Sequence, residues 1–558
     1  MNIDRDLLQF YRYKGIIKEQ DIGKILDGAS AQNQTVREYM LAKEYSSESL
    51  DLGPLSEYYC IPSAEVDLLK VDKALFDKFT LDAMKKNKFL PIKLTDEGVL
   101  LVAMADPLDC NVMSCIAAGF VGDVDVILTS ASQIDRYIDG ALAAESTSSA
   151  LSDLNSEKGT KQGPITDEAE ESEDVVNNPA VRLVDSIIKE AVPAKASDIH
   201  IEPFEKKVRV RYRIDGDLQE RADIPIESFP AICARMKILS GMDIAERRIP
   251  QDGRINLSVG GKEYDFRVSS LPTVYGEKFV IRILDKTAFR FKRQDLGFTE
   301  RENKVIDKLL AAPHGIILLT GPTGCGKSTT LYSFLKEVND PTVNIVTVEN
   351  PVEYTLNGIN QTQVNVKANM TFASALRSIL RQDPDIIMIG EIRDEETAQI
   401  AVRAANTGHL VFSTLHTNDA PSAVIRLEDM GVADYLIADA LIGVIAQRLI
   451  KKLCPVCRKK TKTTPKEMQV LGLKEPTYIY SPQGCQFCNN TGYKGRIGIH
   501  EVMHLNVDMR NIIMHDRNNE ALKECATKNG MVSLWDSCKN LVLEGVTGMS
   551  ELMTLDIE

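Results

Sequence analysis

One short stretch of the chain combines glycines, a lysine and hydroxyl groups at a spacing that suits phosphate binding. Residues 321–329 read Gly-Pro-Thr-Gly-Cys-Gly-Lys-Ser-Thr. Glycines let backbone N–H groups approach phosphate oxygens closely, and Lys327 would reach the β and γ phosphates of a nucleotide. The Ser328 hydroxyl would be a ligand of Mg²⁺. The pattern predicts an ATP-hydrolysing site whose nucleotide-binding residues are Gly321, Pro322, Thr323, Gly324, Cys325, Gly326, Lys327, Ser328 and Thr329.

Two acidic segments further along the chain could complete such a site. Glu391 follows the apolar stretch 384–390, so it would lie at the end of a buried strand. A carboxylate in that place can orient water or serve the Mg²⁺ side of the site. Glu353 closes a second acid-rich stretch, 347–353, and could align the attacking water. Both carboxylates are therefore candidate catalytic groups.

Two histidines flank a third apolar run. His409 precedes residues 410–415 and His416 follows them. A single histidine is usually structural, but two at the ends of one core strand favour a sensor of the γ-phosphate, and His416 is the better candidate. The motifs themselves thus predict four catalytic groups: Lys327, Glu353, Glu391 and His416.

Four of the eleven cysteines form two Cys-x2-Cys pairs, Cys454 with Cys457 and Cys485 with Cys488. Two such pairs at this separation can supply a tetrahedral thiolate cage for Zn²⁺. The alternatives are a redox pair or thiols without a metal. We predict a structural zinc site with no part in catalysis.

The phosphate-binding stretch needs a strand before it and a helix after it, and the sequence supplies both. Residues 315–320 form an apolar run, and a helical pattern begins at 329–331. From residue 299 onward, helices alternate with short apolar strands, which indicates a parallel sheet flanked by helices. Residues 198–284 are rich in strands and follow an amphipathic helix at 179–196. The chain is predicted to be a multidomain α/β protein.

An acidic segment separates the N-terminal part from the rest. Residues 145–178 hold nine acidic and two basic residues and no aromatic residue, a composition typical of a flexible linker. Residues 1–144 would then form a small α+β module of their own. The predicted divisions are 1–144, the linker 145–178, 179–285, a short linker 286–298, 299–453, the cysteine module 454–500 and a C-terminal helical segment 501–558.

The composition sets limits on partners and location. The chain has 558 residues, a net charge of −14 and a pI near 5.2, which argues against general binding to nucleic acid or to anionic membranes. The start lacks an apolar secretory signal, and no run reaches the about 18 uncharged residues that span a bilayer. We expect a cytoplasmic protein whose membrane contact is indirect.

Many stretches in a fixed order resemble one family, the secretion ATPases of type II secretion and type IV pilus assembly. The resemblance covers residues 179–558. The matching stretches are 197–203, 211–216, 270–273 with 276–277, the phosphate-binding loop, 349–353, 380–394, 407–420 and 446–449.

The resemblance implies a hexameric ring that hydrolyses ATP to drive pilin or pseudopilin assembly. Each subunit would have a PAS-like half, here about 179–285, and a RecA-like half, with ATP bound at the interface between them. By motif position, Arg267 and Arg282 look like the arginines that contact the γ-phosphate, although each could be a surface ion pair. Arg377 and Arg381 resemble arginines before the second acid motif, with a clamping or a structural role. Implied partners are an inner-membrane platform protein and a cytoplasmic adaptor, through residues 1–144.

The chain departs from the family pattern at two places. Asn350 stands where the family usually has an aspartate, which removes one carboxylate and leaves Glu349 and Glu353. Residues 1–144 resemble modules of which some bind cyclic di-GMP through paired Arg-Leu-Gly motifs, but the arginine positions fall on Asp6 and Gln34. We therefore predict a docking module that does not bind this nucleotide.

Three other functions remain open. One is a retraction-type pilus motor, although relatives of that type generally lack both a long N-terminal module and the four cysteines. A nucleotide-binding docking scaffold with weak or no hydrolysis is favoured by Asn350. A nucleic-acid translocase would use a similar ring, but the acidic pI and the cysteine module weigh against it. The sequence does not separate type II secretion from pilus assembly.

Overall fold

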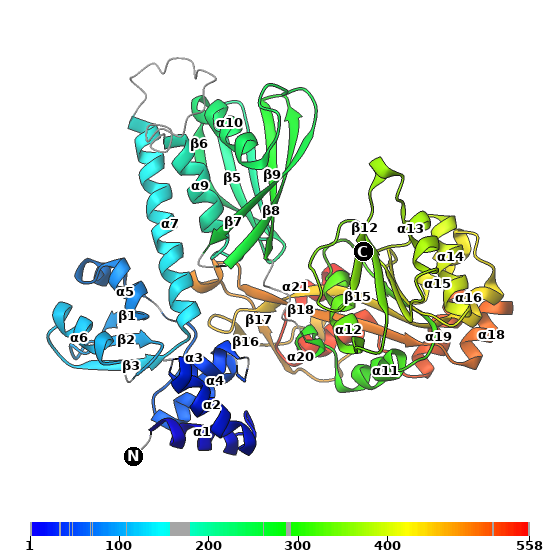
Figure 1. The fold of residues 1–558 in the computed structure, drawn as a ribbon, viewed down its shortest axis with the longest axis horizontal. Helices are drawn as coiled ribbons and strands as arrows, with labels where there is room; N and C mark the ends of the chain where they lie inside the picture. Colours follow the sequence, from blue (N-terminus) through cyan, green and yellow to red (C-terminus); the bar gives the residue numbers. More distant parts are fainter. Residues whose placement is uncertain are drawn as a thin grey trace. The chain divides into compact units, whose positions relative to one another are not determined.

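A computed structural model describes the chain except residues 1–2, 33–34, 44, 47, 67–68, 70, 108, 157–178, 260–261, 286–291, 516–517 and 556–558. The chain divides into two compact units, Met1–Leu284 and Asp285–Glu558, and each is described by itself (Figure 1). Among the described residues, no helix combines the length and the apolar character that crossing a membrane requires.

The first unit begins with helices and continues into a small α+β module. A three-stranded sheet has the order β1-β2-β3, with β1 antiparallel and β3 parallel to β2. Phe79 and Phe89 meet edge to face in its core. The elements are α1 Ile3–Tyr13, α2 Glu19–Gln32, α3 Val36–Ala42, α4 Glu48–Tyr59, η2 Lys73–Lys78, α5 Leu81–Asn87, β1 Phe89–Leu94, β2 Leu100–Met104, α6 Cys110–Gly119, β3 Val124–Leu128 and α7 Ala131–Ser156.

Helix α7 corrects part of the linker prediction. The flexible linker was expected to begin at residue 145, but α7 continues to Ser156. Residues 141–151 contain several alanines and leucines, whose high helix propensity offsets the serines and acids between them. The rest of the expected linker, 157–178, lies outside the described residues.

The second part of this unit is a six-stranded sheet with the order β6-β5-β4-β9-β8-β7. Strand β5 alternates buried and half-exposed residues along its whole length, so one face packs on α9 and α10. Tyr212 is fully buried there, and its hydroxyl donates to the carbonyl of Ile187 over 2.8 Å. The elements are α9 Pro179–Ala191, β4 Asp198–Pro203, β5 Lys207–Ile214, β6 Asp217–Pro225, η3 Ile226–Ser228, α10 Phe229–Ser240, β7 Gln251–Val259, β8 Lys262–Thr273 and β9 Gly276–Asp285.

The second unit is built on a seven-stranded sheet with the order β12-β11-β13-β14-β10-β15-β18. Its first six strands pair in parallel, and β18 is antiparallel to β15. The strands are β10 Gly315–Thr320, β11 Ile345–Glu349, β12 Asn360–Gln363, β13 Ile386–Ile389, β14 Leu410–Leu415, β15 Leu441–Leu453 and β18 Tyr493–His504.

Both faces of this sheet are covered by helices. Along β10, Ile316 and Leu318 join one buried cluster, whereas Ile317 and Leu319 join another. Alternate side chains of a strand point to opposite faces, which explains why the strand is apolar throughout. The helices are α11 Glu300–Leu310, α12 Lys327–Val338, α13 Phe372–Ile379, α14 Glu395–Asn406, α15 Ser422–Asp429, α16 Asp434–Ala440, α18 Val507–His515, α19 Asn519–Lys528, α20 Leu534–Leu543 and α21 Met549–Leu555.

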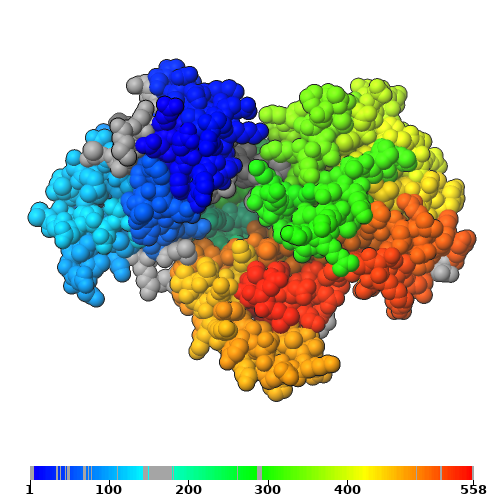
Figure 2. All heavy atoms as spheres, turned by 90° about the horizontal axis from the view of Figure 1, so that it is seen from below, coloured from blue at the N-terminus to red at the C-terminus, as the bar shows by residue number. Residues whose placement is uncertain are grey.

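The four-cysteine module is an insertion between two paired strands of this sheet. It contains β16 Lys459–Lys462, α17 Pro465–Leu471, β17 Tyr478–Ser481 and η6 Gln486–Cys488. Figure 2 shows the module, in orange, beside the red C-terminal helices. The Arg458 guanidinium donates to the carbonyl of Gly545 over 2.7 Å, which joins the two.

Two expected boundaries differ from the observed ones. Strand β18 begins before the expected end of the cysteine module at residue 500 and runs to His504, so it belongs to the ATPase sheet rather than to the module or a purely helical segment. The stretch expected as a short linker, 286–298, contains η4 Arg293–Leu296 and ends on Phe298, which is buried against Phe334.

Candidate nucleotide site

The parallel strands bring the predicted site residues to one edge of the sheet. β10 ends at the phosphate-binding loop, its neighbour β14 ends before His416, and β13, next to β14, ends before Glu391. The carboxyl ends of parallel strands share an edge, which is the usual ligand position in such folds. Residues separated by up to 95 positions in the sequence therefore lie close together.

The phosphate-binding loop is shaped by close backbone contact with β15. Gly321 and Gly326 have φ values of 141° and 92°. A Cβ atom on Gly321 would lie 2.4 Å from the carbonyl oxygen of Gln447, and one on Gly326 would lie 2.9 Å from its Nε2. Only glycine fits both places, and α12 begins directly after Gly326, so its N-terminal N–H groups face the loop.

Lys327 lies at the start of α12 and is 9% exposed. Its ammonium group donates to the carbonyls of Gly321 and Pro322 over 2.6 and 2.9 Å. Burial lowers the pKa of Lys327, and the charge of Glu391 acts in the opposite direction. The cation is therefore held inside the loop by the loop's own carbonyls and lies within electrostatic reach of the predicted acid.

Glu391 contacts two basic side chains. Its Oε2 lies 2.6 Å from Nε of Arg393 and 3.6 Å from Nε2 of His416. The Glu391 side chain is 15% exposed, whereas that of His416 is 46% exposed. A largely buried carboxylate with a half-exposed imidazole beside it can hold a water molecule and sense charge at its outer side. The structure thus brings together three of the predicted catalytic groups: Lys327, Glu391 and His416.

The acid-rich segment after β11 separates into a structural and an exposed part. Glu349 is 4% exposed and accepts hydrogen bonds from Thr347, over 2.6 Å, and from Tyr332. Glu353 is exposed, and its backbone N–H donates to the Tyr332 hydroxyl over 3.3 Å. Of the two acids that flank Asn350, Glu349 is buried and Glu353 is exposed.

His409 has a structural place. Its Nδ1 lies 2.9 Å from the carbonyl oxygen of Ala404 near the C-terminus of α14. A histidine there satisfies a helix-end carbonyl. His416, at the other end of β14, faces Glu391 instead.

Gln447 on β15 is a residue that the sequence interpretation left without a role. It is 3% exposed, and its amide accepts a hydrogen bond from the Thr330 hydroxyl and donates one to the carbonyl of Cys325, both over 2.8 Å. One side chain therefore fastens the loop to the first turn of α12. The available clue was an amide that directly follows the apolar run 441–446.

Arg267 and Arg282, which the family resemblance assigns to the γ-phosphate, belong to the first unit. Arg267 on β8 lies 3.9 Å from Asp265, and Arg282 on β9 lies 3.0 Å from Asp198, with 62% of the Arg282 side chain exposed. In the second unit, Arg377 pairs with Glu396, and Arg381 donates to the carbonyl of Arg377 over 2.8 Å. All four arginines thus have partners within their own unit.

The four cysteines converge as their spacing predicts. Their Sγ atoms all lie within 4.8 Å of one another, with separations of 3.9 Å for Cys454–Cys485, 3.8 Å for Cys457–Cys488 and 3.7 Å for Cys485–Cys488. Zn–S bonds of about 2.3 Å in a tetrahedron place sulfurs about 3.8 Å apart. Backbone N–H groups of Cys485 and Gly492 point at Sγ of Cys488 over 3.2 and 3.1 Å. The donor set and its geometry fit a tetrahedral zinc ion.

Comparisons with known proteins agree with this geometry. The sequence model of a family described as Type II/IV secretion system protein matches residues 173–554, and that of the MshEN domain matches residues 59–148. The chain belongs to the Type II/IV secretion system protein family. With an intact phosphate-binding loop and its acid, this family member is an ATP hydrolase.

Similar full proteins support the same assignment. The type II secretion system protein E of Pseudomonas aeruginosa is 48% identical over 71% of this chain and 79% of its own length. The type II secretion system ATPase E of Vibrio cholerae is 46% identical over 71% and 78%.

A solved structure supports the fold of the core. The ATPase DotB of Yersinia pseudotuberculosis resembles this chain with a TM-score of 0.51 and 19% identity, over 72% of this chain and 100% of DotB. The prediction of a RecA-like ATPase core within a multidomain α/β protein is confirmed. The family match at 59–148 adds an MshEN domain to the part of the chain that contains the three-stranded sheet.

Proposed function

We propose that this chain is a motor that hydrolyses ATP to drive pilin or pseudopilin assembly in a type II secretion or type IV pilus system. The observation that carries the proposal is the meeting of Lys327, Glu391 and His416 at one edge of the parallel sheet. A phosphate loop alone binds nucleotide, whereas an acid beside it provides for hydrolysis.

In this proposal each site residue has one task. The nine loop residues hold the phosphates, with Lys327 on the β and γ phosphates and Ser328 as the protein ligand of Mg²⁺. The ion neutralises charge on the phosphates. Glu391 orients the attacking water, and Glu353, exposed on the other side of the acid segment, serves as the second carboxylate. His416, which faces Glu391, reports the presence of the γ-phosphate.

The remaining parts of the proposal rest on the resemblance described from the sequence. Residues 179–285 would be a PAS-like half. Its Arg267 and Arg282 would reach the γ-phosphate when the two halves of a subunit close. Six chains would form a ring. Arg282 is suited to this because 62% of its side chain is exposed and its ion pair with Asp198 can exchange. Residues 1–144 would dock the ring to an inner-membrane platform protein and a cytoplasmic adaptor. This chain would then be a cytoplasmic protein that is held at the inner membrane through these partners. The cysteine module would hold a structural Zn²⁺.

Replacement of the loop lysine tests the proposal. Lys327→Ala should abolish steady-state phosphate release, because the variant loses the ammonium group that the loop holds for the β and γ phosphates. Glu391→Gln should retain ATP binding by calorimetry and lose turnover, because the amide keeps the shape but cannot act as a carboxylate. Normal phosphate release by either variant would refute the assignment of that residue.

Asn350 favours a second candidate function, a nucleotide-binding docking scaffold with weak or no hydrolysis. Asn350 is exposed directly after β11, where an aspartate would add a carboxylate to the site. The two functions differ in the rate of phosphate release by the natural chain. Asn350→Asp should then raise that rate if the missing acid limits it.

The N-terminal module is expected to dock partners without binding cyclic di-GMP. Calorimetric titration of this module should detect no micromolar binding of that nucleotide.

A further inference from the structure

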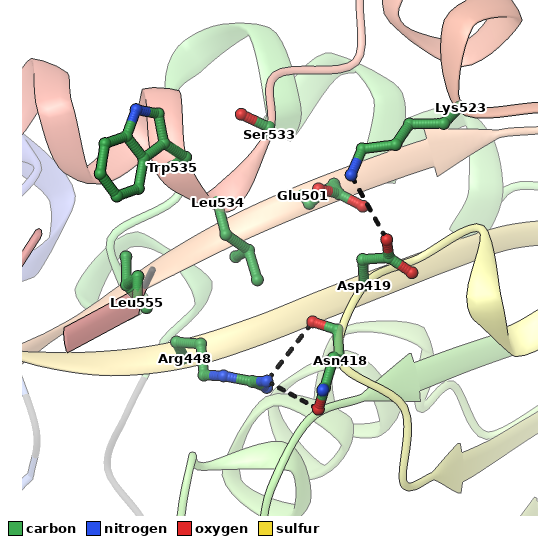
Figure 3. A pocket seen from close by; sticks show the side chains of 9 residues that line it. All are labelled: Asn418, Asp419, Arg448, Glu501, Lys523, Ser533, Leu534, Trp535 and Leu555. Atoms are coloured by element: carbon green, nitrogen blue, oxygen red, sulfur yellow. Dashed lines mark hydrogen bonds and ion pairs between the residues drawn. The ribbon is translucent and has the colours of Figure 1, made fainter. Parts of the chain in front are cut away.

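The loop that follows His416 is held by residues from outside the nucleotide site. Residues 417–421 connect β14 to α15. Nη2 of Arg448, on β15, donates to the carbonyl oxygen and to Oδ1 of Asn418 over 3.4 and 3.3 Å (Figure 3). Arg448 is the neighbour of Gln447, which fastens the phosphate-binding loop. One short piece of β15 thus contacts both loops of the nucleotide site.

Glu501 on β18 makes the second attachment of this loop. The side chain is 2% exposed, and its Oε1 accepts the backbone N–H of Ala420 over 2.8 Å. Burial raises the pKa of Glu501, and hydrogen bonds from the backbone of Ala420 and Leu534 oppose that shift. Leu534 begins α20. A single buried carboxylate therefore joins the His416 loop to the C-terminal helices.

Lys523 on α19 makes the third attachment. Its ammonium nitrogen lies 3.5 Å from Oδ2 of Asp419, and half of the Lys523 side chain is exposed. The other oxygen of Asp419 accepts the N–H of Ser422, the first residue of α15, over 3.0 Å. Each residue from Asn418 to Ala420 is thereby bound to a different element.

A cavity of about 150 Å³ lies beside these attachments. Figure 3 shows Leu534, Trp535 and Leu555 on one side and Arg448 with Asn418 on the other. Space next to a polar loop lets the loop shift without displacing a packed core. Trp535 is the single tryptophan of the chain, so its fluorescence reports on this cavity alone.

We propose that Glu501 and Lys523 are positioning residues for His416, and that the 417–421 loop transmits the nucleotide state to the C-terminal helices around Trp535. The proposal rests on the function proposed above, in which His416 senses the γ-phosphate. A shift of His416 toward or away from Glu391 must move the loop that follows it. That loop is bound by Glu501 on β18 and by Lys523 on α19, and both residues line the cavity together with Trp535.

The test uses the full chain with ATP, ADP and a non-hydrolysable ATP analogue. In the natural chain, the analogue and ADP should give different Trp535 emission. Glu501→Gln places amide hydrogens against a backbone N–H, so we expect kcat to fall about tenfold, the dissociation constant of ATP to change less than about twofold, and the emission difference to vanish. Lys523→Ala should reduce kcat about threefold, and Lys523→Arg should restore it.

Glu524→Gln is the matched control, because Glu524 is exposed, adjoins Lys523 and pairs with Lys528 along its own helix. The control should keep natural kcat and emission. Natural kcat and emission in Glu501→Gln and Lys523→Ala would overturn the proposal, as would an equal loss of ATP affinity and kcat. Absence of ATP turnover in the natural chain would contradict the proposed function and not this inference. The titration of Trp535 emission with nucleotide would still decide whether the nucleotide state reaches the C-terminal helices.

Discussion

At the scale of single residues, the site depends on side chains that hold the loop as much as on those that face phosphate. Gln447 bonds both the Cys325 carbonyl and the Thr330 hydroxyl, and its backbone contacts Gly321 closely enough to exclude a Cβ atom. Lys327 uses two carbonyls of the same loop. The conformation of the loop is therefore fixed partly from β15, a strand that lies more than 100 residues further along the chain.

Replacement of Gln447 by leucine should weaken nucleotide binding. The change leaves a buried carbonyl and a buried hydroxyl without this amide, at a cost of about 1–3 kcal/mol. Part of this free energy stabilises the ordered, nucleotide-binding conformation of the loop. The dissociation constant of ATP should therefore rise about tenfold in calorimetric titration. Gln469→Leu, at an exposed position on α17, is the control. Unchanged affinity in Gln447→Leu would contradict this role.

His500 predicts how the stability of the second unit depends on pH. The side chain stacks on Phe298 with ring centroids 3.7 Å apart, and burial lowers its pKa to about 3. The unfolded chain takes up a proton near pH 6.5, whereas the folded chain does not. Stability contributed by the neutral ring is thus complete above pH 6.5 and is lost as pH falls, by about 2 kcal/mol at pH 5.

His500→Phe keeps an aromatic ring against Phe298 and removes the titration. Calorimetric melting between pH 7 and pH 5 should therefore show a smaller decline for this variant than for the natural chain. His515→Phe changes an exposed histidine and should leave the decline as it was. Equal pH dependence in all three proteins would show that His500 does not remain neutral in the folded state.

At the scale of elements, the cysteine module is an insertion between β15 and β18 whose four thiols fit a zinc ion. Removal of Zn²⁺ by a chelator should lower the melting temperature, because the module's short elements β16, α17 and β17 bury few side chains of their own. Cys488→Ser should lose the metal, and Cys60→Ser, at an exposed cysteine, should keep it. The measurement is zinc content by atomic absorption together with thermal melting. A chain that contains no zinc when purified with its cysteines reduced would contradict the site.

The elements also show how far the sequence alone could lead. Local patterns predicted β10, β13 and β14, because each strand is a continuous apolar run that ends at the site. Glu391 and His416 were found at the ends of β13 and β14, and Lys327 was found in the glycine-rich loop motif that follows β10. Glu501 and Gln447 were not predicted as site residues, because their contacts join strands that no local pattern pairs. Strand β18 was missed for the same reason, because the cysteine module separates it in the sequence from its partner β15. Helix α7 continues into the stretch expected as a linker, because the helix propensity of its alanines and leucines outweighs the linker-like content of serines and acids.

At the scale of the whole molecule, the phosphate loop and the candidate arginines belong to different units. The second unit has two buried clusters of its own, so we expect a fragment 285–558 to fold and bind ATP. It lacks Arg267 and Arg282, and its kcat should be lower than that of the full chain by about 100-fold or more. Phosphate release and calorimetry of the fragment measure the two effects separately.

Two variants of the full chain serve as controls for the fragment. Arg282→Ala and Arg267→Ala should reproduce its low kcat without loss of ATP binding, if these arginines act on the γ-phosphate. Lys207→Ala removes a cation of the same unit that pairs with Asp223 and should have no such effect. A fragment with the full rate would locate every catalytic group in the second unit.

The pairing of β15 with β18 has a consequence for the deletion of the cysteine module. The register brings Leu453 opposite Tyr493, on either side of the cysteine module. A deletion of the intervening codons would leave two chain ends that a short turn can join, with the order of all seven strands unchanged. The cysteine module can therefore be present or absent without a rearrangement of the seven-stranded sheet.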